Sequence, residues 1–95
     1  MNRYELWLLP ANADPSNAVA LGIVYTTKNA SLLDNANFVI RDFLIAKYML
    51  NSPSDVSVGL WNNANGDNSV YKTTVDMRDF RTSSVRKFKA KLVAL

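Results

Sequence analysis

The sequence predicts an α+β domain in which one long amphipathic helix packs on an antiparallel sheet of four to five strands. One segment, about residues 31–50, has helical periodicity, whereas the other apolar runs are short, alternating and rich in β-formers. An Asn-Gly pair between two alternating runs indicates a hairpin. The strand-like runs lie on both sides of the helix in the order β-β-α-β-β-β, which favours separate helix and sheet layers. Ninety-five residues are enough for one domain, residues 1–95.

The helix has recognisable signals at both ends and one clear core face. Ser31 and Asp34 have the spacing of a capping box. Pro53 stops the helix, because the residue before a proline is disfavoured in the helical region. At about 100° per residue the apolar residues gather on one broad face. This face is formed by Leu33, Ala36, Val39, Ile40, Phe43 and Leu44, with Lys47 at its edge.

A second apolar group lies on nearly the opposite side of the helix. It consists of Phe38, Ile45 and Met49. A helix that packs on a single sheet needs no apolar side chains there. Two explanations remain open: the loop at residues 10–17 folds over them, or they form a surface for a partner.

The two runs before the helix are predicted strands joined by a proline-rich loop. Residues 3–9 alternate between a core face and an outer face. The core face has Tyr4, Leu6 and Leu8, and the outer face has Arg3, Glu5 and Trp7. Residues 18–27 are apolar on both faces, which predicts a central strand. Its larger face is Val19, Leu21, Ile23 and Tyr25, and its smaller face, which we expect to accept the helix closely, is Ala18, Ala20, Gly22 and Val24.

Three further strands are predicted after the helix. Residues 55–61 place Val56, Val58 and Leu60 inward and Trp61 outward. Asn65-Gly66 predicts a type I′ turn, which needs positive φ at both central residues. Residues 69–77 then place Tyr71, Thr73, Val75 and Met77 on one face. In the last strand, residues 85–95, the core face is Phe88, Ala90, Leu92 and Ala94, and the other face is Lys87, Lys89 and Lys91.

The composition argues against catalysis. The chain has no cysteine and no histidine, which removes disulfides, thiolate chemistry, the usual zinc ligands and the commonest general base. Ser84 and Lys87 match an S-x-x-K motif, but that motif needs a helix and this segment alternates like a strand. We therefore predict a protein that is not an enzyme and that binds no cofactor and no metal.

The net charge of +3 is confined to the second half of the chain. Charges in residues 1–50 cancel, and no acid follows Asp79. Such a basic end is typical of a nucleic-acid footprint, or of an edge strand that lysines guard against pairing. The charged residues of the helix exclude a membrane span, and the N-terminal run is too short for a signal sequence, so we expect a cytoplasmic protein.

These observations leave two functional hypotheses. The first is a protein-interaction module, such as an adaptor, an inhibitor or a self-associating homodimer. Its predicted partner-binding residues are Phe38, Ile45, Met49, Arg41, Trp7 and Trp61. The alternative is a single-stranded nucleic-acid-binding protein that combines a cationic surface with aromatic stacking. Its predicted contact residues are Arg81, Arg86, Lys87, Lys89, Lys91 and Tyr71.

Overall fold

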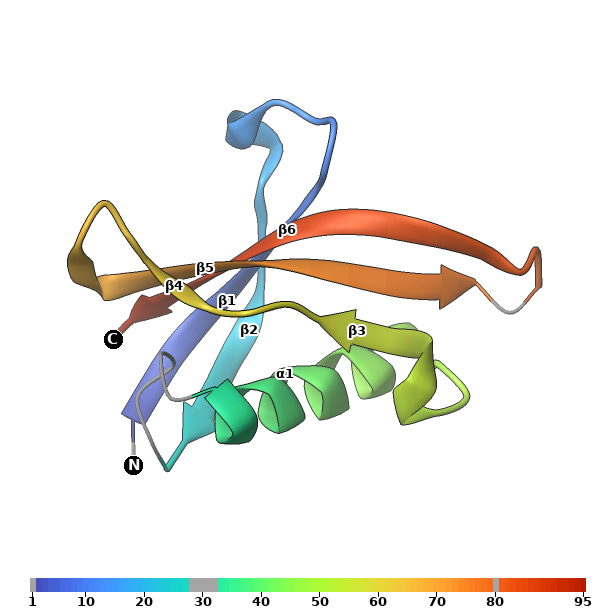
Figure 1. Cartoon of the computed structure of the whole chain (residues 1–95), viewed down its shortest axis with the longest axis horizontal. Coiled ribbons are helices and arrows are strands. Elements are labelled where there is room, and N and C mark those ends of the chain that lie inside the picture. Colours follow the sequence, from blue (N-terminus) through green and yellow to red (C-terminus); the bar gives the residue numbers. More distant parts are fainter. Residues whose placement is uncertain (1, 28–32, 80) are drawn as a thin grey trace.

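The computed structural model describes residues 2–27, 33–79 and 81–95, with the side chains of residues 33 and 34 left out (Figure 1). It confirms the α+β class, with one helix and a six-stranded antiparallel sheet in place of four to five strands. In chain order the elements are β1 (Asn2–Pro10), the 3-10 turn η1 (Pro15–Asn17), β2 (Val19–Thr26), α1 (Leu33–Tyr48), the 3-10 turn η2 (Pro53–Asp55), β3 (Val56–Val58), β4 (Asn62–Ala64), β5 (Asp67–Asp79) and β6 (Ser84–Ala94).

The first and last strands form the middle of the sheet. The strand order is β2-β1-β6-β5-β3, and β4 also pairs with β5. The pairing of β1 with β6 runs from Tyr4 opposite Ala94 to Pro10 opposite Phe88. The prediction that β2 is central was wrong, because β2 is an edge strand with Ile23 and Tyr25 exposed on its outer face. Its apolar character on both faces therefore does not arise from burial on both faces.

The helix α1 lies against the two strands at opposite ends of the sheet order. It packs on β2 and on β3, and Figure 1 shows it on one side of a strongly twisted sheet. The prediction that the small face of β2 accepts the helix holds at Gly22, where a Cβ atom would lie 3.0 Å from the Phe43 ring, but not at Ala20, which the register shift places opposite outward-facing Trp7. The backbone N–H of Thr27 also donates a hydrogen bond to Asn35 Oδ1 (3.0 Å). Both flanks of the helix are therefore close to the sheet.

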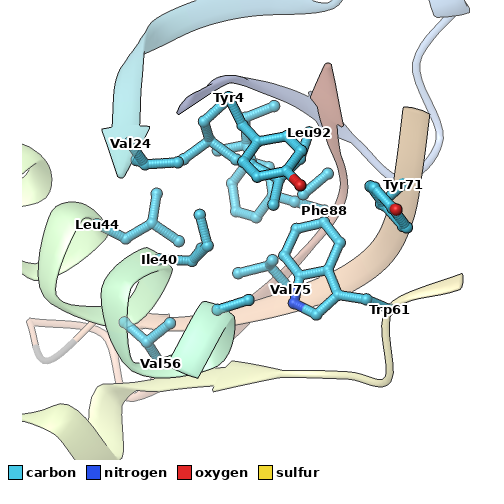
Figure 2. Packing of buried hydrophobic residues seen from close by; sticks show 14 of the residues in the cluster. Tyr4, Val24, Ile40, Leu44, Val56, Trp61, Tyr71, Val75, Phe88 and Leu92 are labelled. Atoms are coloured by element: carbon cyan, nitrogen blue, oxygen red, sulfur yellow. The ribbon is translucent and has the colours of Figure 1, made fainter. Parts of the chain in front are cut away.

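The core lies between α1 and the inner face of the sheet (Figure 2). The predicted core face of the helix is confirmed: Ala36, Ile40 and Leu44 are fully buried, and Val39 and Phe43 pack against them. Lys47 is exposed, and the Leu33 side chain lies outside the described residues. The sheet contributes the predicted inward residues of its long strands: Tyr4, Leu6, Leu8, Tyr71, Thr73, Val75, Met77, Phe88, Ala90 and Leu92.

The ends of the helix differ in part from the prediction. The helix ends at Tyr48, two residues before the predicted end, because Met49 has a left-handed φ of 55°. The N–H of Leu50 then donates to the carbonyl of Ile45 (3.0 Å), which is the long hydrogen bond of a Schellman cap. Ser31, the first residue of the predicted capping box, lies outside the described residues.

The predicted strand at residues 55–61 is interrupted at Gly59. The N–H of Gly59 donates to the carbonyl of Thr74 (2.9 Å), and a Cβ atom on Gly59 would lie only 2.7 Å from Thr74 Oγ1. After this close approach the alternation reverses: Leu60 is 76% exposed and Trp61 is buried. The prediction that Leu60 faces inward and Trp61 outward was therefore wrong.

The Asn-Gly hairpin turn between β4 and β5 is as predicted. Asn65 has φ 54° and Gly66 has φ 76°, which are the positive values that a type I′ turn requires. The side chain of Asn63 donates to Asn68 Oδ1 (2.8 Å) across this turn. The turn returns the chain along β5, whose outer face contributes to the candidate site.

Candidate nucleic-acid interface

The sheet face turned away from α1, here called the outer face, carries most of the positive charge. The residues of the outer face are identified by strand alternation and by the pairing of β1, β5 and β6. Of the eleven lysines and arginines in the chain, six lie on strands at this face: Arg3, Lys72, Arg78, Lys87, Lys89 and Lys91. Of the eight acids, Glu5 and Asp76 lie there. The outer face is therefore more basic than the rest of the protein.

Three lysines form a cluster at the centre of the outer face. Lys72 on β5 and Lys91 on β6 are direct cross-strand partners, and Lys89 is two residues from Lys91 on the same strand. Like charges directly opposite each other destabilise a sheet. In the part of the chain that the structure describes, no carboxylate forms an ion pair with these lysines. The cluster is therefore suited to an anionic ligand, which would relieve the repulsion.

Trp7 lies beside the lysine cluster. It is the cross-strand partner of Lys91, and the Lys91 ammonium nitrogen lies 5.0 Å from the centre of the Trp7 ring. This distance is within the range of a cation–π contact. Trp7 is half-buried on the outer face, as the alternation of β1 predicts. The structure therefore places an aromatic surface next to the cationic one.

A groove of about 290 Å³ separates the lysine cluster from the β1–β2 loop. Its lining includes Trp7, Leu9, Pro15, Lys72, Lys89 and Lys91. Leu9 is 8% exposed, so the groove has an apolar floor and cationic walls. The explanation that this loop covers Phe38, Ile45 and Met49 was wrong, because the loop residues that line the groove stand at the outer face.

Hydrogen bonds to β6 and within the loop hold the β1–β2 loop in place. The N–H of Ala11 donates to the carbonyl of Lys87 (3.0 Å), which continues the β1–β6 pairing beyond Pro10. At the start of η1 the carboxylate of Asp14 accepts the N–H of Ser16 (2.9 Å). Hydrogen bonds from the backbone and the side chain of Ser16 lower the pKa of Asp14. The loop is thus anchored on the strand that carries the lysines.

The residues predicted for nucleic-acid binding are divided between two places. Lys87, Lys89 and Lys91 share the outer face, as predicted. Arg86 lies on the inner side of β6, with its guanidinium carbon 5.1 Å from the centre of the Phe88 ring. Arg81 and Arg86 line a separate groove of about 190 Å³ beyond the C-terminal end of α1. The basic end of the chain is therefore not one continuous surface.

Tyr71 cannot act as a stacking surface in this fold. It is 4% exposed, lies on the inner face opposite Leu92, and contacts Tyr4 edge-on with the ring centres 6.0 Å apart. The aromatic neighbour of the lysines is Trp7, which the sequence predicts to bind protein. Lys72 was missed, although alternation with Tyr71 and Thr73 already indicates that it faces outward.

The predicted protein-binding residues are also separated. Phe38 and Met49 are 60% and 83% exposed. Ile45 instead packs against the core, because it lies one helical turn after Arg41 on the flank of α1 that contacts β3. Arg41 donates from Nε to the carbonyl of Val56 (3.2 Å), and its guanidinium carbon lies 5.8 Å from the centre of the Phe38 ring. Trp61 is buried, and Trp7 is on the other side of the sheet. The six residues do not form one surface.

Within residues 2–27, 33–79 and 81–95, no three Asp or Glu side chains are grouped so that they could hold a metal ion. The helix of these ranges is too short and too polar to cross a membrane. No family model, no curated protein and no solved structure matches this chain.

Proposed function

We propose that this protein binds single-stranded nucleic acid on the outer face of its sheet. The observation that carries the proposal is the cluster of Lys72, Lys89 and Lys91 beside Trp7 and the groove. Proteins that bind single strands combine a positively charged groove with aromatic side chains on which bases stack. The outer face has both components within one small region.

Each component has a defined task in this proposal. The phosphates lie along Lys72 and Lys89, where they neutralise the like charges of the cross-strand cluster. A base stacks on Trp7 and takes the position that the Lys91 ammonium group now occupies, 5.0 Å from the centre of the ring. Lys91 then turns to a phosphate. The apolar floor at Leu9 favours a base or sugar over bulk water.

A single strand fits this surface better than a duplex. Duplex readers place a helix or a two-stranded ribbon in the major groove. Here α1 lies on the other side of the sheet from the lysine cluster and has acidic Asp42 on its exposed surface. A flexible strand with unstacked bases can follow the curved outer face and reach the groove beneath the β1–β2 loop.

The test is a salt titration of oligonucleotide binding. We expect labelled single-stranded DNA or RNA to bind, with log affinity falling by about 0.7 per phosphate contact for each tenfold rise in salt. Lys72→Ala should weaken binding and make that slope shallower by about 0.7, the value for one phosphate contact. Lys47→Ala is the matched control, since Lys47 is exposed on α1. Binding without salt dependence, or an equal loss in both variants, would contradict the proposal.

Protein binding through the exposed side of α1 is a second candidate function. The observation that favours it is the exposure of Phe38 and Met49 on the helix side away from the core. Phe38→Glu should abolish capture of such a partner without changing oligonucleotide affinity, because Phe38 and the lysine cluster lie on opposite sides of the sheet. A loss of oligonucleotide binding in this variant would contradict the separation of the two surfaces.

A further inference from the structure

We propose that two copies of this chain pair through the edge strand β2, forming a continuous antiparallel sheet across a twofold axis. The proposal rests on the free edge of β2, on the direction of its backbone groups and on its lack of charge. It is independent of the nucleic-acid proposal, since it uses other residues and can be tested in buffer without nucleic acid.

The backbone direction along β2 follows from the hydrogen bonds of β1. The carbonyl of Arg3 accepts the N–H of Leu95 (3.0 Å), so the backbone groups of Arg3 point toward β6. In antiparallel pairs such directions alternate from residue to residue. The partners of Arg3 and Glu5 on β2, which are Tyr25 and Ile23, therefore direct their N–H and C=O groups away from β1. In the described residues nothing bonds to these outward groups.

The chemistry of β2 permits pairing with an identical strand. An edge strand is usually protected by lysine, proline or short length. The eight residues of β2, VALGIVYT, contain neither charge nor proline. Two copies can therefore meet without like-charge repulsion, although the protein carries a net charge of +3. Ile23 and Tyr25, which are 47% and 50% exposed, add apolar contact area at the edge.

The opposite end of the sheet is protected. The strand β3 has only three residues, and the carbonyl of its first residue, Val56, accepts a hydrogen bond from Arg41. The helix also packs along β3. Protection of one edge and exposure of the other make β2 the edge at which a second copy can add.

One register gives hydrogen-bond partners to the outward N–H and C=O groups of both copies. With the twofold axis at Val24, Ile23 of each copy lies opposite Tyr25 of the other. Each of these two pairs exchanges both of its hydrogen bonds, as in a hydrogen-bonded antiparallel pair. The side chains of Ile23 and Tyr25 then form aromatic–β-branched pairs on the outer face. The register shift of β2 opposite Leu6 and Trp7 limits the pairing to this short segment.

Amide hydrogen exchange measured at several protein concentrations tests the pairing directly. The N–H groups of Ile23 and Tyr25 should exchange quickly at low concentration and become protected as concentration rises. The N–H of Val24 points toward Tyr4 and serves as the internal control, with protection at every concentration. Exchange of Ile23 and Tyr25 that does not depend on concentration would overturn the proposal.

Substitution at the edge gives a second, independent readout. Ile23→Lys places a lysine opposite Tyr25 of the other copy and sets the two new lysines diagonally across the twofold axis, which should reduce the dimer fraction in sedimentation equilibrium at least tenfold. Ser57→Lys adds the same charge at an exposed position of β3, opposite Asp76 and at the other end of the sheet, and should leave the dimer fraction unchanged. An Ile23→Lys protein that remains folded and still dimerises like the unaltered chain would overturn the proposal.

Discussion

The indole N–H of Trp61 donates a hydrogen bond to the side-chain oxygen of Asn37, with 2.6 Å between the two heavy atoms. Trp61 is 5% exposed and covers one end of the core, and Asn37 lies on the flank of α1. This bond joins the segment after Gly59 to the helix. It also satisfies the single polar atom of the Trp61 side chain.

Asn37→Ala should lower the free energy of unfolding by about 1–3 kcal/mol, because the buried indole N–H loses its acceptor. Urea denaturation followed by circular dichroism measures this change. Asn63→Ala is the control: Asn63 makes its hydrogen bond to Asn68 at an exposed turn, so the expected loss is at most about 0.5 kcal/mol. Equal losses in the two variants would contradict a structural role for the Trp61–Asn37 bond.

Gly59→Ala should destabilise the protein by about 1–3 kcal/mol, since the added methyl group would overlap Thr74 Oγ1 on β5. The second substitution Thr74→Ala removes that atom and should restore about half of the loss. The next neighbour, Thr73 Oγ1 at 3.2 Å, would remain. Thermal unfolding of the two single variants and the double variant measures the effect. If the double variant recovers no stability, the contact with Thr74 is not the cause of the loss in Gly59→Ala.

Met49→Gly should stabilise the protein by about 0.5–1 kcal/mol. Met49 has a φ of 55°, a conformation that is unfavourable for L-residues and free of strain for glycine. Its side chain is 83% exposed, so little packing is lost. Lys47→Gly, inside the last turn of α1, should instead destabilise by about 0.5–1 kcal/mol. Thermal denaturation measures the stability of both variants, and the opposite signs of the two changes test the position of the helix end.

The stability contribution of Asp67 should disappear in acid. The side chain and backbone of Ser69 donate hydrogen bonds to the Asp67 carboxylate (2.6 and 2.8 Å) and hold its pKa below the ordinary value of 3.8. A lowered folded pKa favours the folded state above the ordinary pKa, and the benefit is lost as the pH falls through the lowered value. The stability difference between the unaltered chain and Asp67→Asn should therefore shrink from about pH 6 to about pH 2. A difference that does not vary with pH would contradict this assignment.

Local patterns were sufficient to predict most of the elements. Alternation assigned the inner and outer faces of β1, β5 and β6, and the 3.6-residue period identified Ala36, Ile40 and Leu44 as core. The error at Leu60 and Trp61 arose from Gly59, where contact with another strand interrupts the alternation. The error at β2 arose because apolar residues on both faces are typical of a central strand and also of an exposed edge that can pair. Neither tertiary relationship is visible in the local sequence.

The candidate site could be predicted only in part for the same reason. The three lysines of β6 were found from alternation, because that pattern needs no knowledge of the neighbouring strand. The proximity of Trp7 and Lys72 to them depends on β1 and β5 being the two neighbours of β6, and on the register of each pair. Strand order and register are set by long-range packing. The assignment of Tyr71 to the nucleic-acid surface was wrong for a local reason, because alternation along β5 places Tyr71 with the buried Thr73 and Val75 and on the opposite face from Lys72.

The pairing of β1 with β6 has a consequence for the order of folding. The strand β1, which is synthesised before the other strands of the sheet, lies between β2 and β6, and its pairing with β6 links residues 78 to 90 positions apart. Contacts between such distant residues have a large loop-closure cost, so they form late and slow the folding of the whole domain. During synthesis β1 can pair only with β2 until the final strand has been made. The growing chain would therefore hold an open hairpin, with the apolar side of β1 available to chaperones or to other nascent chains, until β6 has been synthesised and closes the sheet.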